Sequence, residues 1–217
     1  METLAWTLLD GYSIESQLNA DGLSFSAFDI VTKTFKMTGA EKLRGKVVGR
    51  LGSELRQEYR EQNGDKDINL VTGGCYSISL GGAFQVRYSD VFNSRVVYIG
   101  SGNVFGRLKG HLKGKLFDFA GAIRGVPLRF HVADLKETDV SHKDLEQALL
   151  NKFLTESGGS LPLMNKINAK ADVKTKGWPK GWDKPLHKDK GQQIAKWLIQ
   201  PVSFDAWKGV LDKGVSD

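Results

Sequence analysis

Two short runs of strand-forming residues near the middle of the chain most constrain its fold. Residues 75–80 lie between two pairs of glycines, and alternation along a strand places Tyr76 and Ile78 on the same face. Residues 95–100 are rich in β-branched side chains and can pair with the first run in antiparallel fashion. The sequence therefore predicts a β-sheet that contains both runs.

Helical patterns follow this predicted sheet. Residues 101–103 supply turn and N-cap chemistry for a basic helix over residues 104–112. A further strand at 128–132 leads to a helix over 142–155, which stops at Gly158. We therefore predict an α+β fold.

Upstream of the sheet, one long helix is predicted. Thr38 and Glu41 have the spacing of a capping box, and apolar residues then recur at helical spacing, which indicates a helix over 39–62. Residues 23–37 mix β-branched and aromatic side chains and are more typical of a strand.

Glycine and proline residues that interrupt regular structure divide the chain into three parts. We predict an N-terminal extension over residues 1–70, a core over 71–168 and a basic, Trp- and Lys-rich C-terminal extension over 169–217. Two short amphipathic helices are predicted in the last part, at 192–199 and 204–211.

Cysteine content and hydropathy limit the setting of the protein. Cys75 is the single cysteine, which excludes an internal disulfide, and no Cys/His group has the spacing of a zinc site. A reducing, cytoplasmic compartment is therefore expected. The N-terminal residues lack the basic leader of a signal peptide, and no run of about 18 apolar residues predicts a membrane span.

Positive charge is concentrated in two stretches. The net charge of +6 is modest for 217 residues. Residues 165–217 contain eleven lysines and six aspartates, and residues 103–115 contain four cations and no acidic side chain. Spaced cations suit a phosphate backbone, whose binding releases counterions. A solvated lysine-rich surface explains the same composition equally well.

Arg107 and His111 are four residues apart in the predicted basic helix and therefore project from one face. Arg binds phosphate through its planar guanidinium, and His exchanges protons near neutral pH. This pair alone is a weak signal, because exposed Arg and His side chains at helical spacing are common. Gly106, Gly110 and Gly114 suit a place where the helix backbone closely approaches a neighbour, either DNA or the sheet.

Glu146 is predicted to lie on the apolar face of its helix, between Phe153 and Leu150 on a helical wheel. A carboxylate in that position needs a metal or a charged partner, because its desolvation is expensive. Metal binding explains the position about as well as the two alternatives together, which are an internal salt bridge and a different register of the helix. One carboxylate suffices for Mg²⁺ when water and a substrate phosphate complete the coordination.

Taken in order, these residues resemble the motif set of the GIY-YIG nuclease superfamily. The resemblance covers roughly residues 73–168, under half of the chain. The tripeptide Tyr-Ile-Gly alone means little, but five elements in the correct order on the expected strands and helices are specific. The five elements are Gly74-Cys75-Tyr76, Tyr98-Ile99-Gly100, Arg107-x-x-x-His111, Glu146 and Pro162-x-x-Asn165.

The resemblance implies a fold and part of a site. The implied fold is a small three-stranded antiparallel sheet flanked by helices, to which this chain adds mostly helical N- and C-terminal extensions. Tyr76 would position or activate the water nucleophile, Tyr98 would line the same site, and Arg107 would bind and stabilise the phosphate.

The remaining roles implied by the resemblance concern proton transfer and metal binding. His111 would assist proton transfer or orient its neighbours. Glu146 would hold a single Mg²⁺, for which Mn²⁺ can substitute. Asn165 would brace the site from beyond the last helix.

The chain departs from the family pattern in two places. Cys75 replaces the usual isoleucine, and its side chain is expected to point away from Tyr76. The interval between the two tyrosine motifs is longer than usual. Its residues Arg87 and Arg95 either contact nucleic acid or belong to a lengthened hairpin.

Further cations and two tryptophans extend the predicted nucleic-acid interface. Trp178 and Trp182 either stack on bases or, as we favour, anchor the C-terminal segment to the core. The side chains predicted to contact nucleic acid are Lys109, Lys113, Lys115, Arg87, Arg95, Lys174, Lys176 and Lys180.

The sequence thus predicts a metal-dependent endonuclease that acts on double-stranded DNA, in a restriction or mobile-element setting. Self-association is expected, because one site cuts one strand. The alternatives are a non-catalytic or repair-type nucleic-acid-binding module of the same fold, or a nuclease acting on branched DNA or RNA.

Overall fold

The two predicted strands with glycine boundaries are neighbours in the sheet. The computed structural model describes residues 3–25, 37–123, 125–166, 177–187 and 197–199. In it, β2 (Gly74–Leu80) pairs antiparallel with β5 (Val96–Gly102), and Tyr76 lies opposite Gly100. The other side of β2 pairs antiparallel with β6 (Leu128–Asp134). The three strands predicted in the core are therefore confirmed.

The expectation of three strands is incomplete, because β1 (Thr7–Tyr12) adds a fourth. It pairs antiparallel with the outer edge of β6, and the described strands of this sheet follow the order β1-β6-β2-β5. Asp10 and Gly11 interrupt the apolar run of β1, and this turn-like pair concealed the strand in the sequence. β5 is the last strand in this order.

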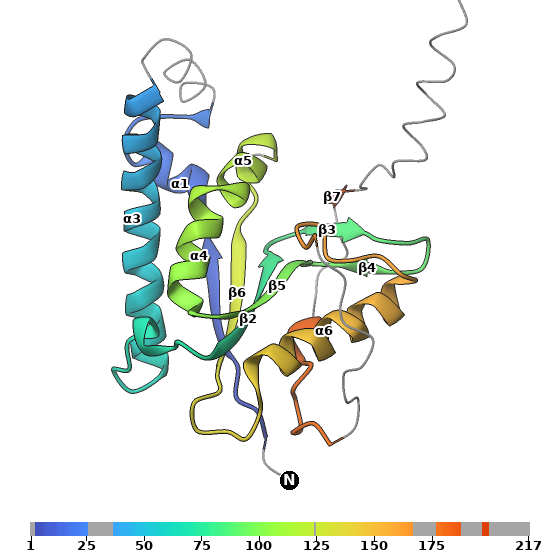
Figure 1. Ribbon diagram of the computed structural model, residues 1–217. Coiled ribbons are helices and arrows are strands. Elements are labelled where there is room, and N and C mark those ends of the chain that lie inside the picture. The colour runs from blue at the N-terminus through green and yellow to red at the C-terminus, as the bar shows by residue number, and fades with distance from the viewer. Residues whose placement is uncertain (1–2, 26–36, 124, 167–176, 188–196, 200–217) are drawn as a thin grey trace, which may run out of the picture.

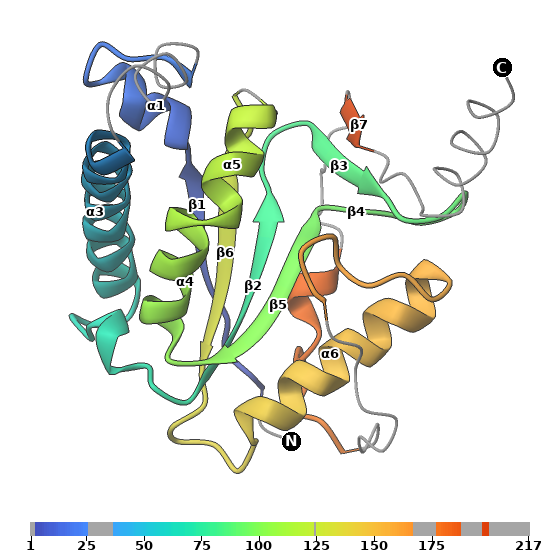
Figure 2. The same cartoon turned by 45° about the horizontal axis from the view of Figure 1, so that its top comes forward.

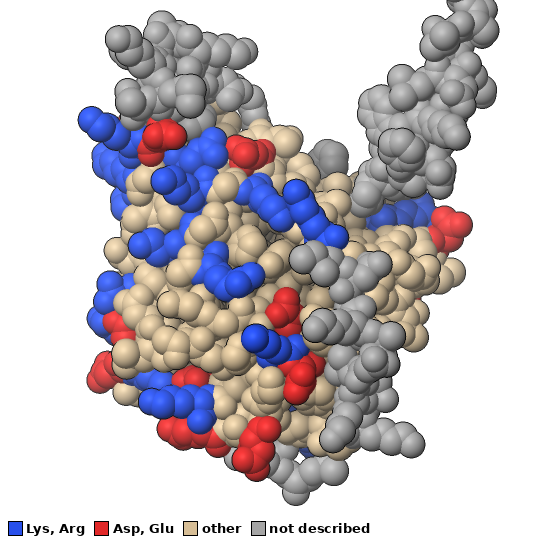
Figure 3. All heavy atoms as spheres, in the orientation of Figure 1, with Lys and Arg blue, Asp and Glu red and all other residues tan. Residues whose placement is uncertain are grey.

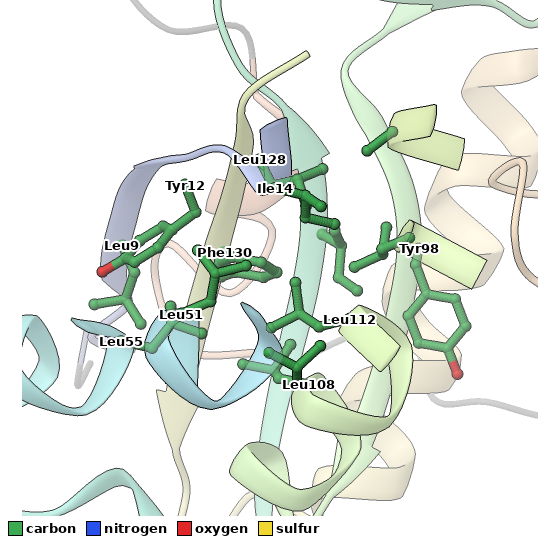
Figure 4. Close-up of a cluster of buried hydrophobic side chains, with 14 of the residues drawn as sticks. Leu9, Tyr12, Ile14, Leu51, Leu55, Tyr98, Leu108, Leu112, Leu128 and Phe130 are labelled. Atoms are coloured by element: carbon green, nitrogen blue, oxygen red, sulfur yellow. The ribbon is translucent and has the colours of Figure 1, made fainter. Parts of the chain in front are cut away.

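One face of the sheet is covered by α1 (Ile14–Asn19), α3 (Met37–Gln62), α4 (Val104–Lys113) and α5 (Lys115–Ala122) (Figures 1 and 2). The short helix η1 (Ile68–Leu70) links α3 to β2. Side chains from these helices and from β1, β2, β5 and β6 form the larger apolar cluster (Figure 4). The long N-terminal helix is confirmed, although Thr38 lies within it and is not its N-cap.

The other face of the sheet is covered by α6 (His142–Ser157) (Figure 2). The helix ends at Gly158, as predicted, with this glycine in the left-handed conformation, and Ser141 caps its first turn. A second apolar cluster joins α6 to this face and includes Cys75. Because Tyr76 belongs to the first cluster, the prediction that Cys75 points away from it is confirmed.

The C-terminal segment 177–187 packs on the α6 side and contains the short helix η2 (Lys184–Leu186). Trp178 and Trp182 stack with ring centroids 5.5 Å apart and pack against the second cluster. Trp6 Nε1 also donates a hydrogen bond to the carbonyl of Gly181 (3.1 Å). These contacts support the interpretation of both tryptophans as anchors.

A second small sheet corrects one prediction. It contains β4 (Asn93–Ser94), β3 (Phe84–Arg87) and β7 (Trp197–Ile199), and β7 runs parallel to β3. The predicted helix over 192–199 is therefore wrong for its last three residues, because they gain strand partners in β3. The strand-like residues 26–36 and the helix predicted at 204–211 lie outside the described residues.

Basic side chains gather on one part of the surface. Lys and Arg predominate on the surface over α3 and α4 (Figure 3). Several of these cations share carboxylates; Arg56 and Arg60, for example, both bind Asp67. None of the helices within the described residues is long and apolar enough to cross a membrane.

Candidate active site

Side chains from a strand and a helix meet at the hydroxyl of Tyr76. Tyr76 lies on the α4 side of β2 and is buried. Its hydroxyl oxygen accepts a hydrogen bond from Arg107 Nε (3.3 Å) and lies 3.0 Å from His111 Nε2. Arg107 and His111 therefore converge on one oxygen atom, as their spacing on the helix predicts.

Tyr98 borders the same cluster. Its ring stacks on that of Tyr76 with centroids 5.9 Å apart, and it lies 4.2 Å from the imidazole of His111. Tyr98 sits at the margin of the apolar core, and its hydroxyl points away from the other labelled side chains (Figure 4). The two tyrosines and the histidine thus form one aromatic group with its polar atoms at the edge of the core.

Gly100 leaves the space that the two tyrosines occupy. A Cβ atom at this position would lie 2.8 Å from the hydroxyl oxygen of Tyr76 and 2.7 Å from the ring of Tyr98. Such distances are too short for any real contact. The glycine after Tyr98 is therefore required by the packing of the site.

The helix α4 aims Arg107 and His111 at the sheet. Asn103 caps the helix and accepts a hydrogen bond from the backbone nitrogen of Gly106 (2.9 Å). The adjoining side of α4 is anchored in the core by Leu108 and Leu112, both fully buried. A capped and anchored helix holds both polar side chains in a defined direction.

The environment shifts the pKa of each polar group in the cluster. Burial raises the pKa of Tyr76 well above its usual value, and the neighbouring Arg107 opposes part of that rise. The hydroxyl of Tyr76 raises the pKa of Arg107, which stays charged. Burial, together with Lys115 and Arg107, lowers the pKa of His111 to about 4. Near neutral pH the imidazole is therefore uncharged and able to accept a proton.

Glu146 approaches β5 from the α6 side. Its carboxylate Oε2 accepts a hydrogen bond from the hydroxyl of Ser101 (2.5 Å). Ser101 follows Gly100 and pairs with Cys75, so its side chain points to the face opposite Tyr76. Glu146 is half-buried and lies on the predicted apolar side of α6.

Arg107 reaches the same end of β5 from the α4 side. Its Cδ would lie 3.8 Å from a Cβ atom at Gly102, the residue after Ser101. Arg107 and Glu146 therefore flank two consecutive residues of β5. Gly102 has no side chain, and Arg107 Cδ is the nearest atom to the space that a Cβ would take there.

Asn165 stabilises the unpaired side of β5. Its Oδ1 accepts a hydrogen bond from the backbone nitrogen of Ile99 (3.0 Å), and its Nδ2 donates one to the carbonyl oxygen of Ile99 (2.9 Å). The backbone nitrogen of Met164 also donates to Val97 (2.8 Å). Asn165 thus continues the sheet edge beside Tyr98 and positions the strand that both halves of the site contact.

The donor set suits only a lightly coordinated metal ion. Within the described residues, no group of three or more His, Cys, Asp or Glu side chains could hold a metal. Glu146 offers one carboxylate beside a hydroxyl, which fits an Mg²⁺ ion that keeps most of its water and binds a substrate phosphate.

Three predicted nucleic-acid contacts lie on or next to α4. Lys115 Nζ donates a hydrogen bond to the carbonyl of Met164 (3.0 Å) and lies 5.9 Å from the centre of the Tyr98 ring. Lys109 and Lys113 are exposed on the side of α4 that faces α3. Lys115 is therefore part of the cluster, whereas Lys109 and Lys113 lie beside it.

The other predicted contacts lie away from the cluster. Arg87 belongs to β3 and faces Asp90 (3.7 Å), and Arg95 precedes β5 on the α6 side. Lys180 is exposed, and its backbone carbonyl accepts a hydrogen bond from Leu4 (2.9 Å). Lys174 and Lys176 lie outside the described residues.

Ser101 was not identified in the sequence as part of the site. It was interpreted only as a turn residue before the basic helix. Alternation along β5 places the Ser101 side chain on the face of the sheet opposite to that of Gly100. Its contact with Glu146, however, depends on where α6 packs.

Comparison with protein-family models, curated proteins and solved structures finds no match to this chain. The motif pattern and the geometry of the site are therefore the grounds for a functional proposal.

Proposed function

We propose that this chain is a divalent-metal-dependent endonuclease of the GIY-YIG type that hydrolyses phosphodiester bonds in DNA. The convergence of Arg107 and His111 on the Tyr76 hydroxyl, beside the strand end that Glu146 contacts, carries the proposal. A guanidinium binds a phosphate directly, and a carboxylate binds it through a cation. The two groups flank the same short piece of β5 from opposite faces, and the proposal requires one phosphodiester to reach both at this strand end.

Tyr76 and His111 provide a path for the proton of the attacking water. As the water oxygen bonds to phosphorus, its proton passes to the Tyr76 hydroxyl while the Tyr76 proton passes to His111 Nε2. The bond from phosphorus to the leaving sugar oxygen breaks, and that oxygen takes a proton from solvent. Burial lowers the pKa of His111 most, and a phosphate beside Arg107 would offset only the smaller contribution of the neighbouring cations, which strengthens the base in part.

Arg107 and Glu146 would stabilise the negative charge on the phosphate. Arg107 holds the phosphate and stabilises the negative charge that builds on its oxygens during attack. Glu146 would hold Mg²⁺, or Mn²⁺ in its place, through one carboxylate oxygen. The ion, when bound, supplies Lewis-acid stabilisation of that same charge.

Double-stranded DNA in a restriction or mobile-element setting is the proposed substrate context. The surface rich in Lys and Arg over α3 and α4 adjoins Arg107 and His111, and it supports binding of a polyanion next to the site (Figure 3). Each chain carries one set of these residues, so a double-strand break would require two chains to act together.

The test is cleavage by the purified full chain. Plasmid, single-stranded DNA, branched DNA and RNA are incubated with Mg²⁺ or with a chelator, and the cut ends are mapped. We expect metal-dependent cleavage of plasmid. Preference for branched DNA or RNA would reassign the substrate.

A substitution separates the nuclease from a binding module. Glu146→Ala should abolish cleavage and leave DNA binding intact. Glu156→Ala is the matched control, because it removes an exposed carboxylate from the same helix. A wild-type chain that binds DNA and cuts none of the four substrates with either Mg²⁺ or Mn²⁺ would be a binding module.

A further inference from the structure

A polar pocket lies on the α6 side of the sheet, on the opposite face from Tyr76. Its volume is about 40 Å³, which holds a few water molecules or one tetrahedral oxyanion. The sheet, the segment that contains β4, and η2 form its walls. The lining residues are Ser79, Phe92, Asn93, Ser94, Arg95, Val96, Arg129, His131, Pro185, Leu186 and His187.

The lining of this pocket is rich in hydrogen-bond donors. It contains two arginines and two histidines and no carboxylate. The carboxylate of Asp10 binds Arg129 (2.5 Å) without lining the pocket, and Asp183 contacts His187 (3.0 Å) in the same way. The groups that face the cavity thus include several hydrogen-bond donors, and the carboxylates that pair with Arg129 and His187 lie outside the lining.

The polar residues stand on strands whose covered face is otherwise apolar. Arg129 and His131 are two residues apart on β6, and they pair with Ser79 and Ser77 on β2. All four side chains therefore share one face of the sheet. Polar groups on a covered sheet face cost free energy unless polar partners satisfy them. Asp10 supplies such a partner to Arg129.

Two arginines reach the pocket from opposite sides of Ser79. Arg129 is the β6 partner of Ser79, and Arg95 precedes Val96, the β5 partner of Ser79. Two guanidiniums that approach from different strands, with a hydroxyl between them, match the several oxygens of a phosphate. We propose that this pocket binds a phosphate group, separately from the nuclease site.

The wall of the pocket that the C-terminal segment forms links phosphate binding to the docking of that segment. Pro185, Leu186 and His187 come from the C-terminal segment, whereas the arginines come from the sheet. A phosphate bound between them would join η2 to the sheet and stabilise the docked C-terminal segment.

The proposal is tested by thermal unfolding of the full chain in increasing inorganic phosphate without added divalent metal. Chloride at matched ionic strength is the reference. We expect phosphate to raise the Tm beyond chloride, because a ligand that binds the folded state stabilises it. Arg95→Gln should weaken the apparent phosphate affinity by about tenfold or more. Arg87→Gln removes the same charge from nearby β3 and should leave the affinity unchanged.

Substitutions in the two sites distinguish this pocket from the nuclease site. Arg107→Gln should retain the effect of phosphate on the Tm. An equal effect of phosphate and chloride, or an effect lost in Arg107→Gln and kept in Arg95→Gln, would overturn the proposal. If Arg95→Gln does not fold, His187→Gln, on the exposed wall, should show the weakened affinity. Neither outcome depends on cleavage, so failure here leaves the nuclease proposal untouched.

The source of the phosphate is identified by further ligands. Adenosine monophosphate and a short 5′-phosphorylated oligonucleotide are compared with the same oligonucleotide lacking its phosphate. Binding of the mononucleotide alone indicates a small-molecule ligand, and binding of the phosphorylated strand indicates a nucleic-acid end. Equal binding of both oligonucleotides by wild type and Arg95→Gln would count against the pocket.

Discussion

The two sides of the end of β5 are built in different ways. On the α4 side, Tyr76 is hydrogen-bonded to Arg107 and lies beside His111, and all three are held by a capped helix and a buried strand. On the α6 side, Glu146 meets the strand through the hydroxyl of Ser101. The first side is organised before any substrate arrives, whereas the second consists of a single half-buried carboxylate.

This difference indicates a division of labour in the proposed enzyme. Proton transfer needs fixed distances between atoms, and the packed tyrosine cluster provides them. Binding of a hydrated ion needs only one oriented carboxylate, since water and phosphate complete its coordination. Changes on the α4 side should therefore affect both geometry and activity, whereas Glu146 should affect activity alone.

Among changes on the α4 side and along β5, the largest expected effect comes from removing one oxygen atom, the hydroxyl of Tyr76. Tyr76→Phe should lower the rate of DNA cleavage by about 10²–10⁴-fold, because Arg107 and His111 lose the atom on which they converge. Single-turnover cleavage measures the loss. Tyr98→Phe removes a hydroxyl from the adjacent ring and should cost less. Equal losses of cleavage rate in Tyr76→Phe and Tyr98→Phe would contradict a special role for the Tyr76 hydroxyl.

Gly100→Ala tests whether packing alone organises the α4 side. The added methyl would collide with both tyrosines and should destabilise the fold by about 1–3 kcal/mol. Urea unfolding measures this change. Gly49→Ala is the contrasting variant, since its Cβ meets nothing within 4 Å at an exposed position of α3, and it should stabilise by about 1 kcal/mol. A neutral result at Gly100 would show that the tyrosines have room to move.

Asn165→Ala tests the edge of β5, the strand that the α4 side and the α6 side of the site both contact. Loss of two hydrogen bonds to Ile99 should reduce stability by about 1–2 kcal/mol. Cleavage should fall as well, because β5 carries contacts of both Arg107 and Glu146. Asn69→Ala changes an exposed asparagine and serves as the control. Unfolding curves and cleavage rates that match the wild type would exclude a bracing role for Asn165.

The smallest expected effect concerns pH. His111 has a pKa of about 4 when folded and about 6.5 when unfolded, so the unfolded chain binds more protons between these values. Stability should therefore fall as the pH is lowered from 6.5 towards 4. Urea unfolding of wild type and His111→Gln at pH 7 and pH 5 measures the difference, which should be smaller in the variant. An identical loss in both proteins would assign the effect to other groups.

Local patterns predicted much of this fold. β2, β5 and β6 carry β-branched or alternating residues between glycines, and α3, α4 and α6 carry apolar residues at helical spacing. β1 was missed because Asp10 and Gly11 look like a turn, although β6 supplies a partner for the strand. β7 was predicted as helix because its parallel pairing with β3 leaves no local trace.

The grouping of Arg107 with His111 was readable from the sequence, because helix geometry alone places residues four apart on one face. The same holds for the placement of Tyr76 and Ile78 on one face of their strand and of Glu146 on the apolar side of its helix. Each of these facts depends only on the period of one element.

The tertiary structure alone decided that Glu146 meets β5 at Ser101, and that Arg107 reaches the neighbouring Gly102 from the opposite face. It also placed Arg95 and Arg129 around one pocket. Periodicity reports which way a side chain points from its own helix or strand. Which elements then lie against each other depends on contacts between residues far apart in the chain, and no local pattern records those contacts.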